Sequence, residues 1–405
     1  MGRVLGLDPL YAHGVSWAVL LIAVIKVLVA FGALLVSVML MIWFERKVIS
    51  DMQARIGPNR AGPWGLLQTL ADGIKLFFKE DLLPERADRF VFKLAPYLSI
   101  VPALLAFVIV PVGGDVTVFG HTFELQVADP PVGILFLLAM SSVSVYGVML
   151  AGWSSGSKYP LLGSVRASAQ MISYEAALGL TVSMVVLLAG SLSTRAIVAA
   201  QAHTFFGSWY LVKAGILPFF LFLVAITAEL NRPPFDLVEA EQELVGGFNT
   251  EYSSIRFALF FMAEFMNTIT MSAVVVTLFL GGPDGPTAHV FILSWVIPVL
   301  WFLGKTLVFL FLYVWLRAAL PRLRYDQLMD LGWKVLIPLS LGWVLVLAAF
   351  LVGRWWGLGV IVALLAVSGL LFRAVWVGSG VDEAEEFDVG EPPTLDVADA
   401  PGTVV

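Results

Sequence analysis

The stretch FDLVEAEQELVGGFNTEY, residues 235–252, concentrates acidic side chains within an otherwise apolar chain. It contains no lysine or arginine, and its five carboxylates are Asp236, Glu239, Glu241, Glu243 and Glu251. Carboxylates this close repel one another, so we expect several of them to have raised proton affinity and to titrate as a coupled group. Such a row of acids can accept protons and pass them on.

The alternative for this stretch is a solvated acidic loop. Apolar residues interleave the acids, however, and the preceding NRPP (231–234) predicts a kinked, non-helical start. A loop made for water is rarely so apolar. We therefore expect the acidic loop, about 231–254, to fold back into the protein.

Three further acids lie in long apolar runs: Glu175 in SYEAALGL, Glu229 in TAELNRPPFD and Glu264 in MAEFMN. At 1.5 Å per residue, the first and third lie roughly 10 to 15 Å inside their runs, whereas Glu229 ends its own. Ionisable groups within a membrane are costly and often serve as proton relays. The alternative is salt bridges between helices, for which Lys305 is the obvious base, since Lys26 can snorkel outward. One or two bases cannot neutralise all these acids, which favours a relay.

The composition places these acids in a membrane. Hydrophobic residues make up 59% of the chain, charged residues 13%, and the mean hydropathy is +0.91. Runs long enough to cross ~30 Å of hydrocarbon occur near 15–44, 95–114, 131–153, 168–192, 210–230, 255–280, 288–316, 335–353 and 356–377. We predict an all-α, polytopic bundle of about nine transmembrane helices forming one domain, 1–377. The first run is too long for a signal peptide.

Lysine and arginine are concentrated on one side of this bundle. Of the 24, eighteen fall on the side that holds the long connections, four on the other side and two within spans. The positive-inside rule then places the amino terminus outside and the long connections in the cytoplasm. The segment 378–405 carries eight acids and no base, which predicts a disordered cytoplasmic tail.

The residue types that are missing limit the chemistry. The chain has no cysteine, so it cannot hold an iron–sulfur cluster or a cysteine-based zinc site of its own. All four histidines fall on the outer side of the predicted bundle, and a membrane haem needs facing histidines within the helices. We therefore expect no cofactor to be bound by this chain, and any electrons must come from a partner.

The first cytoplasmic connection contains a predicted amphipathic helix, at about 65–80. Apolar residues recur there at spacings of three and four, with polar residues on another face. Such a helix lies at the membrane interface. It either pins the loop or forms the floor of an opening for a lipid-soluble ligand.

Four long motifs occur in order between residues 45 and 334. They are ERKVISDMQARIGPNRAGPWGLLQTLADGIKLFFKED, AGWSSGSKYPLLGSVRASAQMISYE, AELNRPPFDLVEAEQELVGGFNTEYSSIRFALFFMAEFMN and RAALPRLRYDQLMDLGWK. Together they resemble the quinone-chamber membrane subunit, often called the H subunit, of respiratory complex I, the proton-pumping NADH:quinone oxidoreductase.

This resemblance implies a site. In that family the cytoplasmic loops help to form a chamber in which quinone is reduced by an iron–sulfur cluster of a neighbouring subunit. The implied proton-relay acids are Glu175, Glu229, Glu239, Glu241, Glu243 and Glu264. The implied chamber residues are Arg46, Gln53, Arg55, Leu67, Lys75, Asp236, Phe248, Arg317, Arg322 and Arg324. Docking of peripheral subunits or lipid headgroups is the alternative role for the arginines.

The resemblance also implies partners. The substrate is a quinone, menaquinone or ubiquinone, and the iron–sulfur clusters and FMN belong to partner subunits. Peripheral-arm subunits bind the cytoplasmic face, and small and antiporter-like membrane subunits lie alongside. A bacterial plasma (inner) membrane fits this chain best.

Two features depart from the family pattern. The ninth apolar run and the acidic tail extend beyond shorter members, and Ser141, Ser142 and Ser144 stand where some relatives place another carboxylate. A serine or a water can bridge that position. The rival interpretations are an anchor subunit of a proton-coupled hydrogenase or formate hydrogenlyase complex, a free-standing proton-coupled transporter and a passive anchor.

Overall fold

The structure is a computed structural model that describes residues 16–118, 121–202, 207–237, 245–286 and 293–386, together with Asp8, Leu10 and Gly14. It divides into two compact units, Met1–Val344 and Leu345–Val405. The division falls within one helix. The predicted limits of membrane domain and tail, 1–377 and 378–405, stay predictions.

Helices make up most of the first unit. They are α1 (Trp17–Met52), α2 (Gln68–Phe78), α3 (Arg89–Phe107), α4 (Gly133–Ser154), α5 (Lys158–Ala189), α6 (Thr194–Gln201), α7 (Tyr210–Lys213), α8 (Ile216–Glu229), α10 (Ser254–Phe279), α11 (Leu293–Ala319), α12 (Tyr325–Asp330) and the first half of α13 (Ile337–Val352). Shorter elements are the 3-10 turns η3 (Pro63–Gly65) and η4 (Gly247–Asn249), the π-helical turn η5 (Leu331–Leu336) and the antiparallel strands β1 (Asp115–Val118) and β2 (His121–Glu124).

Local side chains set several helix ends. The Ser16 hydroxyl accepts a hydrogen bond from the backbone N–H of Val19 at the start of α1, and Asp88 caps α3 in the same way. Helix α5 ends at Gly190, whose φ of 67° is the left-handed conformation that glycine adopts easily. Helix α8 stops at Glu229, just before NRPP, as predicted.

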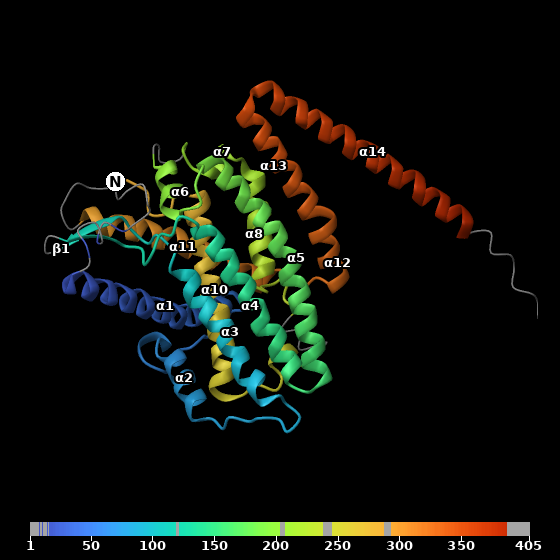
Figure 1. Cartoon of the computed structure of the whole chain (residues 1–405). Coiled ribbons are helices and arrows are strands. Elements are labelled where there is room, and N and C mark those ends of the chain that lie inside the picture. The colour runs from blue at the N-terminus through green and yellow to red at the C-terminus, as the bar shows by residue number, and fades with distance from the viewer. Residues whose placement is uncertain are drawn as a thin grey trace, which may run out of the picture. The chain divides into compact units, whose positions relative to one another are not determined.

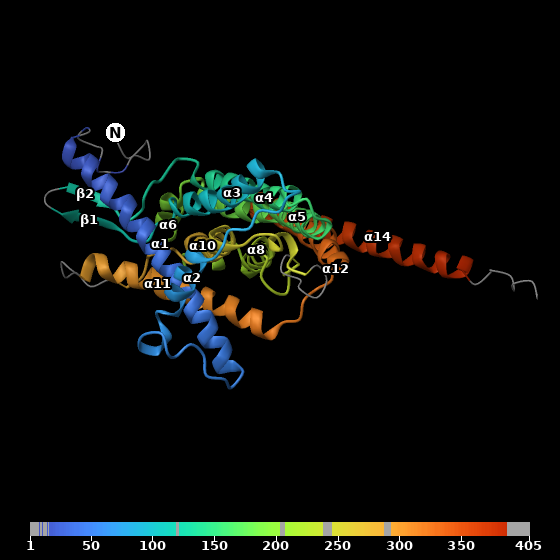
Figure 2. The same cartoon turned by 90° about the horizontal axis from the view of Figure 1, so that it is seen from below.

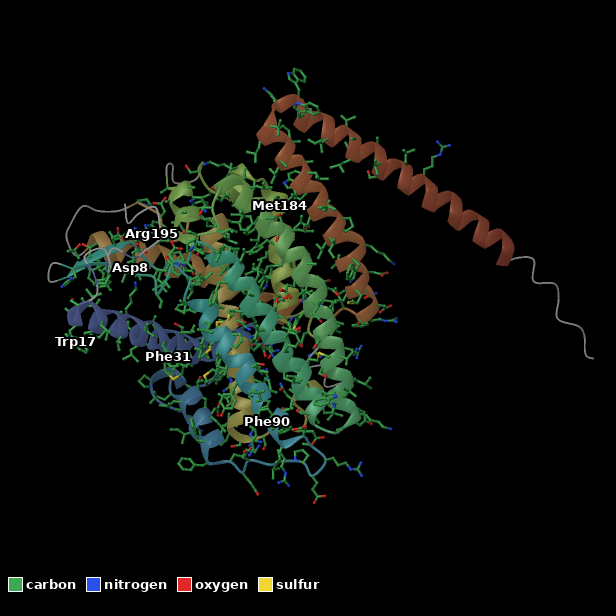
Figure 3. All side chains as sticks on the ribbon, in the orientation of Figure 1. Asp8, Trp17, Phe31, Phe90, Met184 and Arg195 are labelled. Carbon is green, nitrogen blue, oxygen red and sulfur yellow. The ribbon has the colours of Figure 1, made fainter. Side chains whose placement is uncertain are left out.

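Two groups of helices form the bundle of the first unit. Helices α3, α4 and α5 lie side by side, and α8 and α10 pack against them (Figures 1 and 2). Helices α1 and α11 contact α10 and are inclined to the α3–α5 layer (Figure 2). Figure 3 shows Phe90 of α3 and Met184 of α5 toward opposite ends of this layer. The main hydrophobic core lies among α4, α5, α8 and α10.

The predicted spans agree with the structure in type and differ in their ends. Seven described helices are long and apolar enough to cross a membrane. A predicted span at 210–230 is instead divided at Gly215 (φ 92°) into α7 and the 14-residue α8. The ninth predicted span coincides with the apolar start of α14 (Arg354–Glu386), so α14 also includes nine residues of the predicted tail.

Amphipathic helix α2 lies within the predicted range, and the exposed residues on it include Leu70, Ile74, Phe77 and Phe78. The hairpin β1–β2 and helix α6 were not predicted, because both lie in polar segments between apolar runs. Arg195 of α6 pairs with Asp115 of β1 at 2.9 Å and so ties the two together.

In the second unit, α14 follows the end of α13 after Gly353. A Cβ at Gly357 would lie 2.5 Å from the ring of Phe350. Glycine at this position therefore allows the first turn of α14 to approach the end of α13.

Candidate functional site

Glu229 ends α8 in the middle of the bundle and is 5% exposed. The hydroxyl of Ser141 on α4 donates a hydrogen bond to its Oε1 atom. The other carboxylate oxygen, Oε2, is buried and has no hydrogen-bond partner among the described residues. A buried carboxylate oxygen without a protein partner is a natural site for bound water or a proton.

Glu175 of α5 is connected to the same part of α4. The hydroxyl of Ser142 donates to Glu175 Oε1 and also to the backbone carbonyl of Leu138 at 3.0 Å. Two consecutive serines of α4 therefore bind acids from two different helices, α8 and α5. The serine position considered as a bridge in the sequence therefore contacts both acids, one through each serine. That it carries protons between them stays a prediction. Helix α5 begins at Lys158, so Glu175 lies ~25 Å inside it, deeper than the predicted 10 to 15 Å.

Glu264 of α10 belongs to a cluster of four charged side chains. Its Oε1 lies 3.2 Å from Nη2 of Arg232, and Nη1 of Arg232 lies 3.3 Å from Glu45 Oε2. Arg317 of α11 pairs with the other oxygen of Glu45. The Arg232 guanidinium also stands over the ring of Phe265, 4.7 Å from its centroid.

This cluster corrects the sequence interpretation, which considers bases only within apolar runs and takes Lys305 as the candidate partner for the acids. Lys305 Nζ donates instead to the carbonyls of Leu280, Gly282 and Asp284, at 2.8 to 3.0 Å. The sequence did not indicate Arg232 as a partner because this residue lies after the end of α8, outside the apolar run. In the structure it is nevertheless buried, with 3% of its surface exposed. For Glu264, salt bridging between helices is therefore part of its role.

A cavity of about 60 Å³ lies between Glu229 and Glu264, which both line it. Three buried oxygens in its lining have no hydrogen-bond partner among the described residues: Ser99 Oγ, Glu229 Oε2 and Asn249 Oδ1. At about 30 Å³ per water molecule, the cavity holds roughly two waters. The polar lining and the volume leave room for water between the two acids.

A second cavity, of about 10 Å³, lies on the other side of Asn267. Asn267 lines both cavities, and the smaller one is also lined by Ser141 and Thr270. The hydroxyl of Thr270 is buried without a partner among the described residues. Helix α10 thus presents Glu264, Asn267 and Thr270 at successive spacings of three, on one face.

The described start of the acidic loop, residues 231–237, folds back into the protein, as predicted. Phe235, Asp236 and Leu237 are 4%, 3% and 2% exposed. The Gln170 side chain of α5 donates to the backbone carbonyls of Ala228 and Phe235, and so binds both sides of the NRPP turn. Three of the predicted relay acids, Glu239, Glu241 and Glu243, lie outside the described residues.

Of the predicted chamber residues, four lie beside these groups. Asp236 pairs with Arg322 at 3.1 Å, Arg317 belongs to the cluster around Glu45, and Phe248 of η4 lines the larger polar cavity. The predicted Arg324 is exposed and pairs with Asp326 of α12.

The remaining predicted chamber residues surround α2. Arg46 pairs with Asp72 at 2.6 Å, and Lys75 lies 3.8 Å from the same carboxylate. Partial burial opposes ionisation of Asp72, but the hydrogen bond and charge of Arg46 hold its pKa below the usual value. Gln53, Arg55 and Leu67 are exposed, and the first two are joined by a side-chain hydrogen bond.

Sequence reasoning missed Glu45, Arg232, Gln170 and Asn267 among these polar groups. Glu45 stands at the end of an apolar run beside Arg46, and Arg232 comes three residues after Glu229. Both positions could have been noticed as charges next to a span. Within the described ranges, no group of three or more His, Asp or Glu side chains is arranged to hold a metal ion.

Comparison with known proteins identifies the family. The family described as NADH dehydrogenase matches residues 25–348. The H subunit of the NADH-quinone oxidoreductase of Frankia casuarinae is 50% identical over 399 residues, 95% of this chain and 86% of the relative. The protein of the same name from Frankia alni is 50% identical over 393 residues, 94% of this chain and 85% of the relative. The chain belongs to the NADH dehydrogenase family, which confirms the resemblance seen in its motifs.

Proposed function

We propose that this chain forms part of a quinone-binding chamber and links quinone reduction to proton translocation through its buried acids. Membership of the family makes it a membrane subunit of an NADH-quinone oxidoreductase. The observation that carries the coupling role is the polar cavity shared by Glu229 and Glu264, with Ser141 and Ser142 continuing from Glu229 to Glu175.

The polar groups support a route from Glu264 to Glu175. Glu264 and Glu229 exchange protons through water in the cavity between them, and Ser141 holds Glu229 against α4. Ser142 holds Glu175 one residue further along. The acids come from three helices, so a proton that enters at Glu264 can reach α5 within the interior of the bundle. The remainder of the acidic loop, with Glu239, Glu241 and Glu243, is proposed to deliver protons to this route.

The chamber is proposed to lie at the end of the bundle where α1 meets α2. Reduction of a quinone to quinol takes two electrons and two protons. The ion pair Arg46–Asp72 places charge there, and Glu45 connects the same end of α1 to Glu264 through Arg232. A change of charge on the quinone therefore acts electrostatically on a cluster that includes a relay acid.

The remaining features of the proposal follow the family. The electrons come from iron–sulfur clusters, and FMN is in a partner subunit; the substrate is menaquinone or ubiquinone. The peripheral subunits bind at the cytoplasmic face, and other membrane subunits bind laterally. The chain is a membrane protein, and we propose a bacterial plasma membrane with the amino terminus outside and the acidic tail in the cytoplasm.

The main test is Glu229→Gln in the assembled enzyme. The amide is nearly the same size and still accepts from Ser141, but it cannot bind and release a proton at neutral pH. Proton pumping should fall at least about tenfold, because the amide cannot take up and release the proton at this step. Quinone reduction should slow along with it. Glu85→Gln, at an exposed position, is the matched control and should change neither rate. Wild-type pumping and reduction in the Glu229 variant would refute the relay.

A second test separates the water route from the acids. Asn267→Leu keeps the side-chain volume but replaces the polar group between the two cavities with an apolar one. Pumping should slow while the Arg232–Glu264 ion pair and enzyme assembly are kept. Asn267→Ser leaves room for water and should retain most of the pumping. Equal pumping in the leucine and serine variants would mean that protons do not pass this residue.

A further inference from the structure

A large apolar cavity lies away from the acids, at the other end of α1. Its volume is about 640 Å³, and its walls come from α1, the end of α3, the segment around β2, α10 and α11. All of its lining residues belong to the described part of the chain. Ser37, the lining residue of α1 closest in sequence to Glu45, is eight residues away, or ~12 Å along the helix. The cavity is therefore separate from the proposed chamber and relay.

The walls of the cavity offer almost no free hydrogen-bonding groups to water. The polar side chains that line the cavity are Lys26, Ser37, Gln126 and Thr306. Ser37 and Thr306 donate to carbonyls of their own helices, and the Gln126 amide donates to two carbonyls and a threonine hydroxyl. Lys26 pairs with Asp8, and both side chains are 12% exposed. A cavity this apolar is filled by hydrocarbon, because water needs two to four polar partners.

The size of the cavity selects among apolar occupants. A methylene group is about as large as a water molecule, at about 30 Å³, so 640 Å³ holds roughly twenty of them. A helix about 10 Å wide fills roughly 80 Å² in cross-section, so only ~8 Å of its length would fit. That is one and a half turns, far less than a membrane-crossing helix. The volume therefore fits a lipid acyl chain inside the cavity better than a helix inserted into it.

The charge at the cavity fits one end of such a lipid. Lys26 is the one ionised side chain among the lining residues, all of which are described. It stands about 14 Å along α1 from Trp17, at the depth where a long side chain reaches toward the membrane interface. Figure 3 shows Asp8, its partner, near the start of α1. A lipid phosphate can share the Lys26 ammonium with Asp8 while its acyl chain enters the cavity.

We propose that this cavity is a binding site for one membrane phospholipid. An acyl chain lies between α1, α10 and α11, and the phosphate binds Lys26. The lipid contacts the apolar side chains of α1 and α11 that line the cavity. It thereby supports α1, the helix that carries Glu45 and Arg46 at its other end.

Two positions on α11 test this proposal in the assembled enzyme. Val299 lines the cavity, and its neighbour Leu300 is 60% exposed on another face. A photoreactive phenylalanine analogue is placed at either position, and the enzyme is washed extensively in detergent before illumination. Val299 should still crosslink to phospholipid, as read by mass spectrometry, whereas Leu300 should lose its lipid. Native gels confirm that both variants assemble.

Lys26→Gln provides the second measurement. Loss of one ionic contact should lower phospholipid crosslinking at Val299 by roughly fivefold. The proposal is overturned if Val299 crosslinks to quinone, to another subunit or to the amino-terminal segment of the chain itself. It is also overturned if Val299 and Leu300 lose lipid equally, or if Lys26→Gln changes nothing.

Discussion

Removing the Arg232 guanidinium should destabilise the protein strongly, because this group neutralises two acids at once. Among the four side chains of the cluster, Arg232 and Arg317 balance Glu45 and Glu264. Arg232→Gln leaves this set with one excess negative charge. Arg232 itself is 3% exposed and Glu45 is 6% exposed, so solvent screens the excess charge poorly.

The size of the effect follows from burial. Breaking a buried ion pair by removing one partner costs about 3 to 5 kcal/mol, and the value here should lie at the lower end because the Glu264 side chain is 28% exposed. Glu264→Gln should lower the free energy of unfolding less than Arg232→Gln does, since Arg232 still forms its ion pair with Glu45. The double variant Arg232→Gln/Glu264→Gln restores the charge balance, so it should be more stable than Arg232→Gln alone.

The assay is a denaturant titration of the purified chain in lipid discs, followed by the fluorescence of its 13 tryptophans. Arg256→Gln is the matched control, because its pair with Asp81 at 2.8 Å is more exposed and involves one acid, so its loss should lower the free energy of unfolding clearly less. The reasoning is refuted if Arg232→Gln and Arg256→Gln shift the midpoint equally. Simple additivity of Arg232→Gln and Glu264→Gln would also refute it.

Two further predictions concern packing and pH. Gly163→Ala should lower the free energy of unfolding by about 1 to 3 kcal/mol, because the added Cβ would lie 2.9 Å from the backbone of Gly247. The control is Gly179→Ala, also on α5, where an added Cβ would have nothing within 4 Å. It should leave stability unchanged or raise it in the same titration. Asp72 has a lowered pKa because of Arg46, so its contribution to stability is present above the usual pKa of about 3.9 and is lost as the pH falls through the lowered value. Asp72→Asn should therefore show faster proteolysis of the loop before α2 at pH 7. The wild-type protein should show the same increase only below about pH 4. Equal cleavage of both proteins at pH 7 would contradict this.

The sequence predicted where helices occur better than where they end. Apolar runs mark segments that face lipid, but polar residues that face the inside of a bundle extend a helix without extending the run. Helix α5 begins ten residues before its predicted start at 168, and its first turns bury Ser164 completely. Conversely, the apolar run 210–230 contains a helix break that hydropathy does not reveal. Gly215 interrupts the helix there, and glycine does not make the run more polar.

The acids of the site were predictable and their partners were not. Glu175, Glu229 and Glu264 stand out because a charge within an apolar run needs an explanation. Arg232 and Gln170 reach the acids and the loop from neighbouring segments, and only the folded arrangement brings them there. The resemblance supplied the family, while the connection through Ser141 and Ser142 required the structure.

The shortness of α8 affects how membrane voltage acts on this protein. Fourteen residues span only ~21 Å, against ~30 Å for the hydrocarbon layer. Helix α8 alone therefore does not cross this layer, and its end places Glu229 part of the way through it. The transmembrane potential is worth about 2.3 kcal/mol for one charge that crosses the whole layer at 100 mV. Binding a proton at Glu229 moves charge through only part of that potential, so membrane voltage should act on the proton occupancy of this acid.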